Sequence, residues 1–484
     1  MDDLLVLLDA AVPYAAVVAT LSAGVAAALH AVLRKRDTRA AISWVLLILL
    51  LPLLGAVLYA SFGVNRIRRR ARALGLRHTH VAEREAPCHV RPDAVGAALS
   101  RPEFERLARL VDRVSHFPLM GGNAVEFLEG GDAAFPAMIA AIDRAERSVA
   151  LSSYIFDDDR AGRPFVAALE RATARGVATR VLVDGIGVRY SKTPVTALLA
   201  KARVPHALFR PKPFPFALPL VNLRNHRKIL VVDGRIGFTG GMNIREGALL
   251  SLSPRHPMRD LHARVEGPVV SQLAEAFADD WMFATDETLS GDAWFPPPAV
   301  RGGVVARAVT SGPDEDFETI RLSLLGAIAS ARRSVRIVTP YFLPDASLLT
   351  ALNVAALQGV DVEIVLPARN NLPFVHWAMM ATIWQVLERG CRVFLTPPPF
   401  DHTKLTVVDG VWTHFGSANW DSRSLRLNFE FDVECYDKGI AAEASRLVDE
   451  RLASGRPLTL EEADSRNVAV RLRDGVARLF SPYL

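Results

Sequence analysis

Two short strings of residues in this chain carry the same side chains at the same spacing. The first begins at His226 and the second at His402. Counting from each histidine, a lysine lies two residues on, an aspartate seven, a glycine eight and again fourteen, and an asparagine seventeen. One such string could arise by chance, but two in identical register indicate a duplicated site. The shared positions are Lys228, Asp233, Gly234, Gly240 and Asn243 in the first string, and Lys404, Asp409, Gly410, Gly416 and Asn419 in the second.

The doubled set of side chains suits a reaction at a phosphodiester. Ammonium and amide groups can bind the non-bridging oxygens as charge develops on them in the transition state. One neutral imidazole can attack phosphorus to give a phosphohistidine, while the other, protonated, donates to the leaving oxygen. The second histidine then takes a proton from the incoming hydroxyl. This chemistry needs no metal or cofactor, and no cluster of carboxylates that would hold a metal is evident in the sequence.

Strands are expected to position these groups. Residues 229–232 and 405–408 are apolar and rich in β-branched side chains, and an Asp-Gly pair follows each as a turn. Alternation along a strand places each histidine and its lysine on the same face. A second strand, over 237–239 and 412–415, then leads to the glycine-rich turn, where a small residue lets backbone N–H groups approach an anion.

The two aspartates of the strings are expected to have a different place. They lie at an odd step from their histidines, so their side chains should face away from the imidazoles. Asp233 and Asp409 are therefore expected to hold local turns or strands together, although they complete the signature.

The surroundings of the strings repeat as well. A helix signal at 141–149 leads into an apolar strand that ends at Phe156, and the same pattern at 327–335 leads into a strand that ends at Phe342. The sequence therefore predicts a long-period repeat of two α/β halves. The boundary is expected in the Pro- and Gly-rich stretch at 296–303.

The composition of the chain indicates the charge of its partner. The chain has 484 residues, of which 50% are hydrophobic, and its net charge is +5 with a pI near 9.2. This balance favours an anionic partner, either nucleic acid or an acidic membrane surface. Three cysteines without metal-ligand spacing indicate neither a disulfide scaffold nor a zinc site.

The N-terminus reads as a transmembrane helical hairpin. Residues 10–33 and 40–64 are each longer than the roughly 20 residues that cross a hydrocarbon core, and only a short basic link separates them. Two buried helices of a soluble domain are the alternative. The loop carries four basic residues and the segment 66–77 carries six, which favours a cytoplasmic location for the rest of the chain. That arginine cluster could contact anionic headgroups or simply flank the membrane span.

Two apolar segments precede the strings. Residues 211–223 are proline-rich and are expected to form a loop at the membrane. Residues 372–384 carry Phe374, Trp377 and Trp384 at helical spacing, which fits either a lipid-facing surface or ordinary core packing. Such an apolar approach would exclude water, which competes with a hydroxyl acceptor for a phosphohistidine.

The chain resembles the phospholipase D superfamily and, within it, the bacterial cardiolipin synthases. The resemblance covers nearly the whole chain and goes beyond the doubled His-x-Lys-x4-Asp pattern. Its further matches are Ala40–Trp44 in the hairpin, Gly240–Ile244, Arg259-Asp260, Thr339–Asp345, Gly416–Ser424, Asn428–Glu430 and the terminal Leu479–Leu484. The chain has Met258 where the family often has Trp, and Asn370-Asn371 where Ser or Asp is common, which leaves the choice of acceptor less defined.

The resemblance implies a fold, a reaction and a role for each residue. The fold is α/β, with two phospholipase D-like domains related by a pseudo-twofold axis and the active site between them. The reaction transfers a phosphatidyl group from one phosphatidylglycerol to another, releasing glycerol and giving cardiolipin. By position, His226 is the nucleophile and His402 the general acid/base. The remaining implied roles are phosphate binding for Lys228, Lys404, Asn243, Ser417 and Asn419, and orientation of the imidazoles for Asp260 and Glu430.

The expected organisation follows from these readings. It comprises a transmembrane hairpin at 1–64, a basic juxtamembrane connector at 65–115, a first phospholipase D-like domain at 116–300 and a second at 301–484. A multi-pass protein of the bacterial cytoplasmic membrane is expected, with phosphatidylglycerol, cardiolipin and an anionic membrane surface as partners. A phospholipase D-type hydrolase using water as acceptor is the alternative. A nuclease is disfavoured because no aromatic and basic stacking platform is evident, so no nucleic acid is expected; the oligomeric state stays open.

Overall fold

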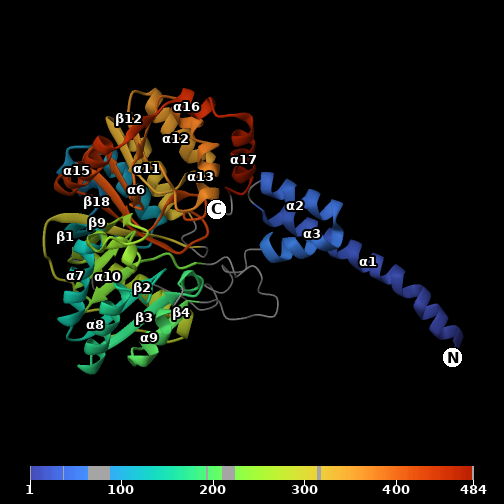
Figure 1. Ribbon diagram of the computed structural model, residues 1–484, viewed down its shortest axis with the longest axis horizontal. Coiled ribbons are helices and arrows are strands. Elements are labelled where there is room, and N and C mark those ends of the chain that lie inside the picture. Colours follow the sequence, from blue (N-terminus) through green and yellow to red (C-terminus); the bar gives the residue numbers. More distant parts are fainter. Residues whose placement is uncertain are drawn as a thin grey trace. The chain divides into compact units, whose positions relative to one another are not determined.

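The computed structural model describes residues 2–35, 38–63, 88–191, 194–209, 224–312 and 318–481 (Figure 1). The chain divides into two compact units. The N-terminal unit comprises residues 1–75 and 211–223, and the C-terminal unit comprises residues 76–210 and 224–484. The two units are described separately below.

One helix of the N-terminal unit is long and apolar enough to cross a membrane. Helix α1 (Asp2–Arg34) contains the apolar stretch Val12–Arg34, whose 23 residues have a mean hydropathy of 2.0. Within the described residues this is the one helix that meets that length and hydropathy. It agrees with the expected first span at 10–33.

The second apolar segment differs from the continuous span expected over 40–64. It forms α2 (Thr38–Leu50), α3 (Pro52–Leu58) and a π-helical turn (Tyr59–Gly63). The helix breaks because Pro52 has no N–H to donate and Leu51 leaves the helical conformation, with φ −135° and ψ 75°. With 13 residues, α2 rises only about 20 Å, less than the roughly 30 Å of a hydrocarbon core.

A glycine lets α3 fold back against α2. A Cβ atom at Gly55 would lie 2.7 Å from the Cα atom of Ile48, so only glycine permits this approach of two backbones. Tyr59 is buried beside Ala31 and Ile48, and its hydroxyl lies 2.8 Å from Nδ1 of His30. The three helices therefore pack around one small apolar cluster.

The C-terminal unit is built on a sheet of 15 described strands. Their order is β19-β13-β12-β10-β15-β16-β18-β9-β1-β8-β6-β5-β2-β3-β4. The first half supplies β1 (Met120–Glu129), β2 (Ser148–Ser153), β3 (Ala178–Asp184), β4 (His206–Phe209), β5 (Ile229–Val232), β6 (Ile236–Gly240) and β8 (Leu261–Glu266). The second half supplies β9 (Val304–Ser311), β10 (Ser334–Val338), β12 (Asp361–Pro367), β13 (Arg392–Thr396), β15 (Leu405–Val408), β16 (Trp412–Gly416), β18 (Glu430–Tyr436) and β19 (Arg456–Leu458).

This strand order confirms the predicted repeat. Reading outward from the β1–β9 pair, β8, β6, β5, β2, β3 and β4 on one side correspond to β18, β16, β15, β10, β12 and β13 on the other. The pairing directions match too, because β2–β3 and β10–β12 are parallel whereas β2–β5 and β10–β15 are antiparallel. The two halves are therefore related by a pseudo-twofold axis at β1 and β9.

Helices cover the sheet and close a core in each half (Figure 1). Those of the first half are α7 (Gly130–Asp143), α8 (Gly162–Ala174), α9 (Val195–Lys201) and α10 (Val269–Thr285). Those of the second half are α11 (Thr319–Ser330), α12 (Ala346–Leu357), α13 (Pro373–Met380), α14 (Trp384–Leu387), α15 (Lys438–Ser454), α16 (Leu460–Asp464) and α17 (Val468–Leu479).

The described part of the expected connector belongs to the second core. Residues 88–115 contain α5 (Pro92–Leu99) and α6 (Pro102–Val114). Phe104 and Leu107 of α6 are buried in the same cluster as Ile320 of α11. The arginine cluster expected at 66–77 lies outside the described residues.

The Asp-Gly turns predicted after the motif strands are confirmed. β5 and β15 have the predicted bounds, and each returns through an antiparallel hairpin into β6 or β16. Both turn residues have positive φ, 54° and 62° at Asp233 and Gly234, and 53° and 67° at Asp409 and Gly410. Aspartate and glycine tolerate this left-handed conformation better than other residues, which explains the pair in both copies.

Candidate active site

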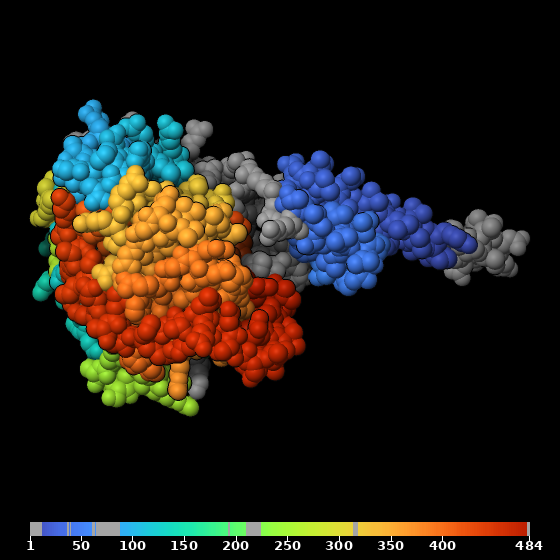
Figure 2. Space-filling view, turned by 90° about the horizontal axis from the view of Figure 1, so that it is seen from above, coloured from blue at the N-terminus to red at the C-terminus, as the bar shows by residue number. Residues whose placement is uncertain are grey.

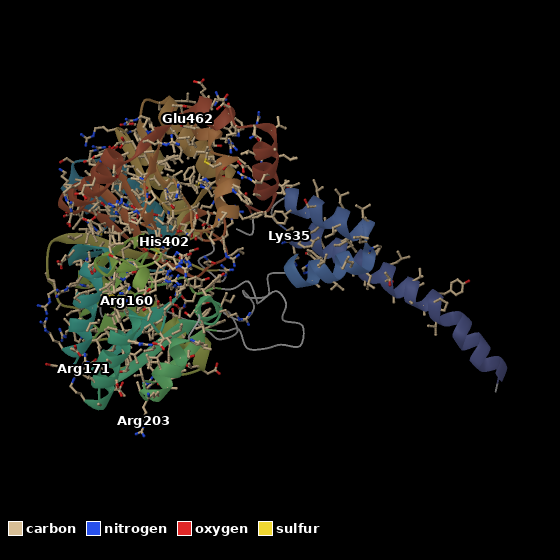
Figure 3. The ribbon with its side chains drawn as sticks, viewed as in Figure 1. Lys35, Arg160, Arg171, Arg203, His402 and Glu462 are labelled. Carbon is tan, nitrogen blue, oxygen red and sulfur yellow. The ribbon has the colours of Figure 1, made fainter. Side chains whose placement is uncertain are left out.

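Each histidine and its lysine lie on one face, as alternation predicts. They occupy the last extended residues before β5 and β15. The Lys228 ammonium donates to the carbonyl oxygen of His226, and that of Lys404 to the carbonyl oxygen of His402, each at 2.5 Å. All four residues lie in the C-terminal unit, where Figure 3 places His402 between the two halves. Each ammonium is thus held beside its own imidazole.

The backbone before each histidine pairs with the opposite half of the chain. The short strand β14 (Phe400–Asp401) runs parallel to β7 (Met258–Arg259), and the N–H of His402 donates to the carbonyl of Arg259 at 2.8 Å. In the symmetric place Asn225 bridges to Phe429, and the N–H of His226 donates to the carbonyl of Phe429 at 2.9 Å. The residue after each acceptor carbonyl is a carboxylate, Asp260 or Glu430.

The two carboxylates are consequently exchanged between the halves. Asp260 from the first half faces the second histidine, with 2.8 Å between its Oδ2 and Nδ1 of His402. Glu430 from the second half faces the first histidine, with a longer 3.2 Å between its Oε1 and Nδ1 of His226. Both carboxylates are fully buried. The contact of Asp260 is a hydrogen bond to Nδ1 of His402, whereas Glu430 lies near Nδ1 of His226 without hydrogen-bond geometry. The ammonium of Lys404 lies 3.1 Å from Nε2 of His402.

Burial and the neighbouring ammonium groups keep both imidazoles uncharged in this site. Burial, followed by the charge of Lys228, lowers the pKa of His226 to about 4. Burial, followed by the charge of Lys404, lowers the pKa of His402 to about 4. The charge of each lysine also reaches the histidine of the opposite half, so the two motifs form one electrostatic environment.

The lysines are themselves shifted. Burial is the main cause, and it lowers the pKa of Lys228 to about 7 and that of Lys404 to about 8. For Asp260, burial raises the pKa, but the hydrogen bond with His402 and the charge of Lys404 outweigh it, so the net pKa falls below its usual value. The site therefore has a marginally protonated pair of cations and a neutral pair of imidazoles, ready for an anion.

The three uncharged residues expected to bind phosphate, Asn243, Ser417 and Asn419, are buried just after β6 and β16. Asn243 accepts the N–H of Ile155 on its Oδ1 at 3.1 Å, which leaves its amide N–H groups to donate. Ser417 donates to Glu430 at 2.6 Å, and the amide of Asn419 donates to Ser424 at 3.2 Å. Ser417 thus acts on the carboxylate that orients His226.

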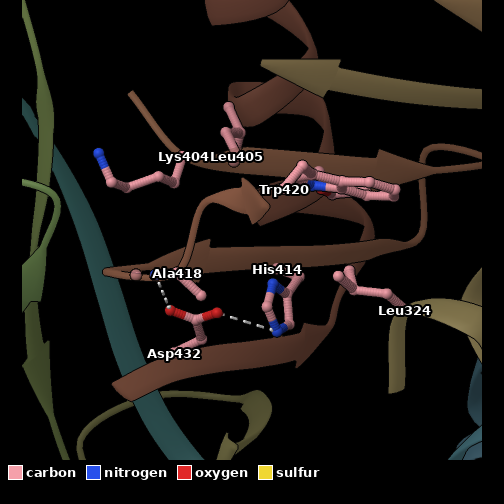
Figure 4. Close-up of a pocket in the computed structure, with 9 residues that line it drawn as sticks. Leu324, Lys404, Leu405, His414, Ala418, Trp420 and Asp432 are labelled. Atoms are coloured by element: carbon pink, nitrogen blue, oxygen red, sulfur yellow. Dashed lines mark hydrogen bonds and ion pairs between the residues drawn. The ribbon is translucent and has the colours of Figure 1, made fainter. Parts of the chain in front are cut away.

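A further buried carboxylate, that of Asp432, holds the backbone of the glycine-rich turn. Asp432 accepts the N–H groups of Ser417 and Ala418 at 2.7 and 3.0 Å, and it lines a small pocket with Lys404 and His414 (Figure 4). A Cβ atom at Gly416 would lie 2.5 Å from the carbonyl oxygen of Phe431 on β18. Gly416 therefore lets β18, the strand that carries Glu430 and Asp432, approach closely. From the sequence, this glycine was explained only by the approach of backbone N–H groups to an anion.

Asp233 and Asp409, grouped with the catalytic set by the signature, do not join the histidines. Asp233 accepts the N–H groups of residues 146–148, at the start of β2. Asp409 accepts those of residues 332–334, at the start of β10, and it also pairs with Arg101 of α6. Both carboxylates hold helix-to-strand connections at the ends of β5 and β15 that are remote from the histidines.

Two tyrosines that were not identified from the sequence as site residues lie at the site. The ring of Tyr154 lies 4.5 Å from that of His226, and the ring of Tyr341 lies 6.1 Å from that of His402. Burial raises the pKa of both phenols, so they remain protonated hydrogen-bond donors. They follow the repeated strands β2 and β10, but at positions one residue apart in the repeat, because Tyr341 corresponds to Ile155.

The two apolar segments before the motifs have different outcomes. Residues 211–223 lie outside the described residues. In 372–384 both readings hold in part, because Val375 and Met379 are buried in the core whereas Leu372, Phe374 and Trp384 are exposed.

Comparison with known proteins gives consistent matches over the chain. Residues 138–281 and 324–452 match the family described as "Cardiolipin synthase, PLD-like domain", and residues 24–63 match "Phospholipase_D-nuclease N-terminal". The chain is 35% identical to cardiolipin synthase A of Pseudomonas putida strain F1 over 95% of this chain and 96% of that protein. It has the same identity and coverage with cardiolipin synthase A of Pseudomonas entomophila.

A solved structure shares the fold. The phosphatidylserine synthase of Haemophilus influenzae superposes with a TM-score of 0.61, covering 78% of this chain and 100% of that one, at 13% identity. At that identity the match concerns the fold alone.

Proposed function

The chain belongs to the cardiolipin synthases with phospholipase D-like domains, and from this premise we propose that it joins two phosphatidylglycerol molecules through a phosphohistidine. It is a membrane-associated phosphatidyltransferase that acts on phospholipids. The proposal concerns which lipids react and which residues carry the steps.

The exchange of carboxylates between the halves supports the proposal most. Each imidazole has a carboxylate from the opposite half near its Nδ1, and both lysines are buried beside the histidines. A metal-free displacement at phosphorus requires a nucleophile, a proton donor and charge neutralisation, and these four groups supply all three.

In the first step Nε2 of His226 attacks the phosphorus of one phosphatidylglycerol. The negative charge of the bound phosphodiester raises the pKa of His402, which burial and the lysines lower in the free site, so His402 takes up a proton before the reaction. The bond from phosphorus to the headgroup glycerol oxygen then breaks, and His402 donates that proton to the oxygen as glycerol leaves. Lys228, Lys404, Asn243 and Asn419 bind the non-bridging oxygens. The closer carboxylate contact, 2.8 Å at His402 against 3.2 Å at His226, favours His402 as the imidazolium, because Asp260 stabilises its positive charge.

In the second step the roles reverse. Neutral His402 takes the proton from a headgroup hydroxyl of the second phosphatidylglycerol, and the oxygen attacks phosphorus. The bond between phosphorus and His226 breaks, giving cardiolipin and the free enzyme. Ser417 and Glu430 keep His226 oriented throughout.

The proposal includes a location in the cell. Helix α1 anchors the chain in the cytoplasmic membrane, and the excess of arginines at 66–77 favours a cytoplasmic catalytic unit. Because the segment after α1 is divided into shorter helices, a topology experiment is needed to count the membrane crossings. A reporter fused after residue 484 and a cysteine at residue 36, labelled from outside the cell, would distinguish one crossing from two.

A lipid assay tests the reaction. Membranes that contain the protein are incubated with phosphatidylglycerol labelled in its acyl chains and headgroup, and the lipids are separated. We expect cardiolipin and free glycerol in equal amounts. Phosphatidic acid as the main product would replace the proposal with hydrolysis, in which water is the acceptor at the same residues.

Substrate binding is expected to weaken as the pH rises through 7 to 8. The lowered pKa values mean that Lys228 loses its proton as the pH rises past about 7 and Lys404 as it rises past about 8. The positive charges that bind phosphate are then lost. The measurement is the KM for phosphatidylglycerol in mixed micelles at constant surface concentration. In Lys228→Arg, whose guanidinium keeps its proton, the rise in KM should begin about one pH unit later. A constant KM up to pH 10 would contradict the assigned role of the lysines.

A further inference from the structure

Helix α17 exposes an apolar stripe that the motifs do not explain. Val468, Leu472 and Leu479 are 80%, 68% and 72% exposed, and Val476 and Phe480 are exposed as well. At 3.6 residues per turn these five side chains lie on one side of the helix. The C-terminal residues lie at the surface of their unit, in red in Figure 2.

The opposite side of α17 packs on the C-terminal unit. Asp474 and Ala477 are buried, and the guanidinium of Arg473 lies 4.5 Å from the ring centre of Trp377 on α13. Arg466, just before the helix, donates to the carbonyl of Met380 at 2.7 Å. The exposed stripe therefore belongs to a helix that is fixed in place rather than to a frayed end.

Basic side chains border the stripe. Arg471 and Arg478 are exposed along one side of it, whereas Arg473 on the other side pairs with Asp474 and packs on Trp377. An apolar stripe between arginines is the pattern of a helix that lies in the headgroup region of an anionic membrane.

The stripe continues toward the active site. Phe480 contacts Phe374 of α13, with 5.6 Å between ring centres, and both Phe374 and Leu372 are exposed. The residue before Leu372 is Asn371, whose Oδ1 accepts the hydroxyl of Tyr341 at 2.8 Å. Since Tyr341 lies against His402, a single chain of contacts joins the exposed apolar residues to the reacting groups.

We propose that this surface, formed by Val468, Leu472, Val476, Leu479 and Phe480 with Leu372 and Phe374, docks on the anionic lipid monolayer that holds the substrate. This lipid-docking surface rests on the proposed function and adds a route, since acyl chains can stay in the monolayer while a headgroup reaches His402. Charge complementarity selects the occupant: the arginines face phosphate headgroups and the stripe enters the acyl region. The docking surface is separate from the anchor α1.

Full-length protein reconstituted in phosphatidylglycerol-containing vesicles can report this contact directly. In a Cys88→Ser background, Cys391 and Cys435 are buried, so a cysteine introduced by Leu472→Cys can be labelled with a polarity-sensitive fluorophore. We expect strong quenching by lipids brominated in their acyl chains. The matched control is Leu357→Cys, because Leu357 is also 68% exposed. It lies at the end of α12, just before β12, whereas Asn371 follows the other end of β12.

Activity supplies a second measurement. Leu472→Glu combined with Leu479→Glu should lower cardiolipin synthesis from vesicles about tenfold, because charged groups cannot enter the acyl region. The same variant should keep its activity on dihexanoyl phosphatidylglycerol, which is monomeric in water, and Leu357→Glu should change neither activity.

Three other outcomes would overturn the docking surface, and a fourth would overturn the function on which it rests. Equal quenching at 472 and 357, or an equal loss on vesicles and monomeric lipid, would remove the membrane contact. Disulfide-linked dimers through position 472 without quenching would assign the surface to a second copy of the chain. Failure of the unaltered protein to make cardiolipin from either lipid would instead defeat the proposed function.

Discussion

His226→Ala and His402→Ala should each reduce cardiolipin synthesis by at least about 10⁴-fold, because each removes an obligatory partner in bond making or proton transfer. Without His226 there is no nucleophile, and without His402 the glycerol oxygen leaves as an unprotonated alkoxide. The assay follows labelled phosphatidylglycerol in reconstituted vesicles. His206→Ala is the control, since this half-buried histidine of β4 bonds locally, to the carbonyl of Val204, among the residues that the structure describes.

A donor with a good leaving group separates the two roles. Phosphatidyl p-nitrophenol releases nitrophenolate, which needs no proton, so His402→Ala should still give one burst of nitrophenolate and a labelled protein. His226→Ala should give neither. Label on the protein in His226→Ala, or activity near that of the control in either alanine variant, would contradict the assignment.

Asp409→Ala should lower the free energy of unfolding by about 3–5 kcal/mol, since it removes the buried carboxylate that accepts the N–H groups of residues 332–334 and leaves Arg101 paired with Glu103. The expected fall in unfolding temperature is roughly 5–10 °C, followed by intrinsic fluorescence in detergent. Asp233→Ala should cost less, about 2–3 kcal/mol, because that carboxylate is only half-buried and has no arginine partner among the described contacts.

The same variant also tests whether the signature aspartate reacts. The strand β15 separates Asp409 from Lys404 by roughly 16 Å, at about 3.3 Å per residue. Turnover per folded molecule at low temperature should therefore stay within about twofold of the unaltered protein, since no interaction with the transition state is removed. A large loss of turnover with unchanged unfolding temperature would return Asp409 to the catalytic set.

Local patterns predicted the parts of this site that depend on neighbours in sequence. The alternation of apolar residues defined β5 and β15, and the Asp-Gly pairs required left-handed backbone, so the hairpins followed directly. The doubled spacing likewise indicated two equivalent halves. These features are set by side-chain period and backbone sterics, which a sequence displays openly.

The exchange of carboxylates could not be derived in that way. Asp260 and Glu430 were singled out, but their partners depend on short strands that pair between halves, β7 with β14 and Asn225 with Phe429. Such pairing is decided by the packing of the two halves, and no periodicity within either half records it.

The shape of the second apolar segment was also not predicted. Hydropathy counts apolar residues without regard to the backbone, so the span expected over residues 40–64 gave no indication that the helix breaks at Leu51. Pro52 and Gly55 carried the signal for a break and a reversal, and both act through backbone geometry. The stripe on α17 was missed for a related reason, since only the packed side of that helix reveals which side is left exposed.

The exchanged carboxylates make each half incomplete as a unit of inheritance. Either half alone holds a histidine without its orienting acid and an acid without its histidine. A substitution at Glu430 in the second half is felt at His226 in the first, so the halves cannot diverge independently. Each copy therefore limits which substitutions the other copy can accept.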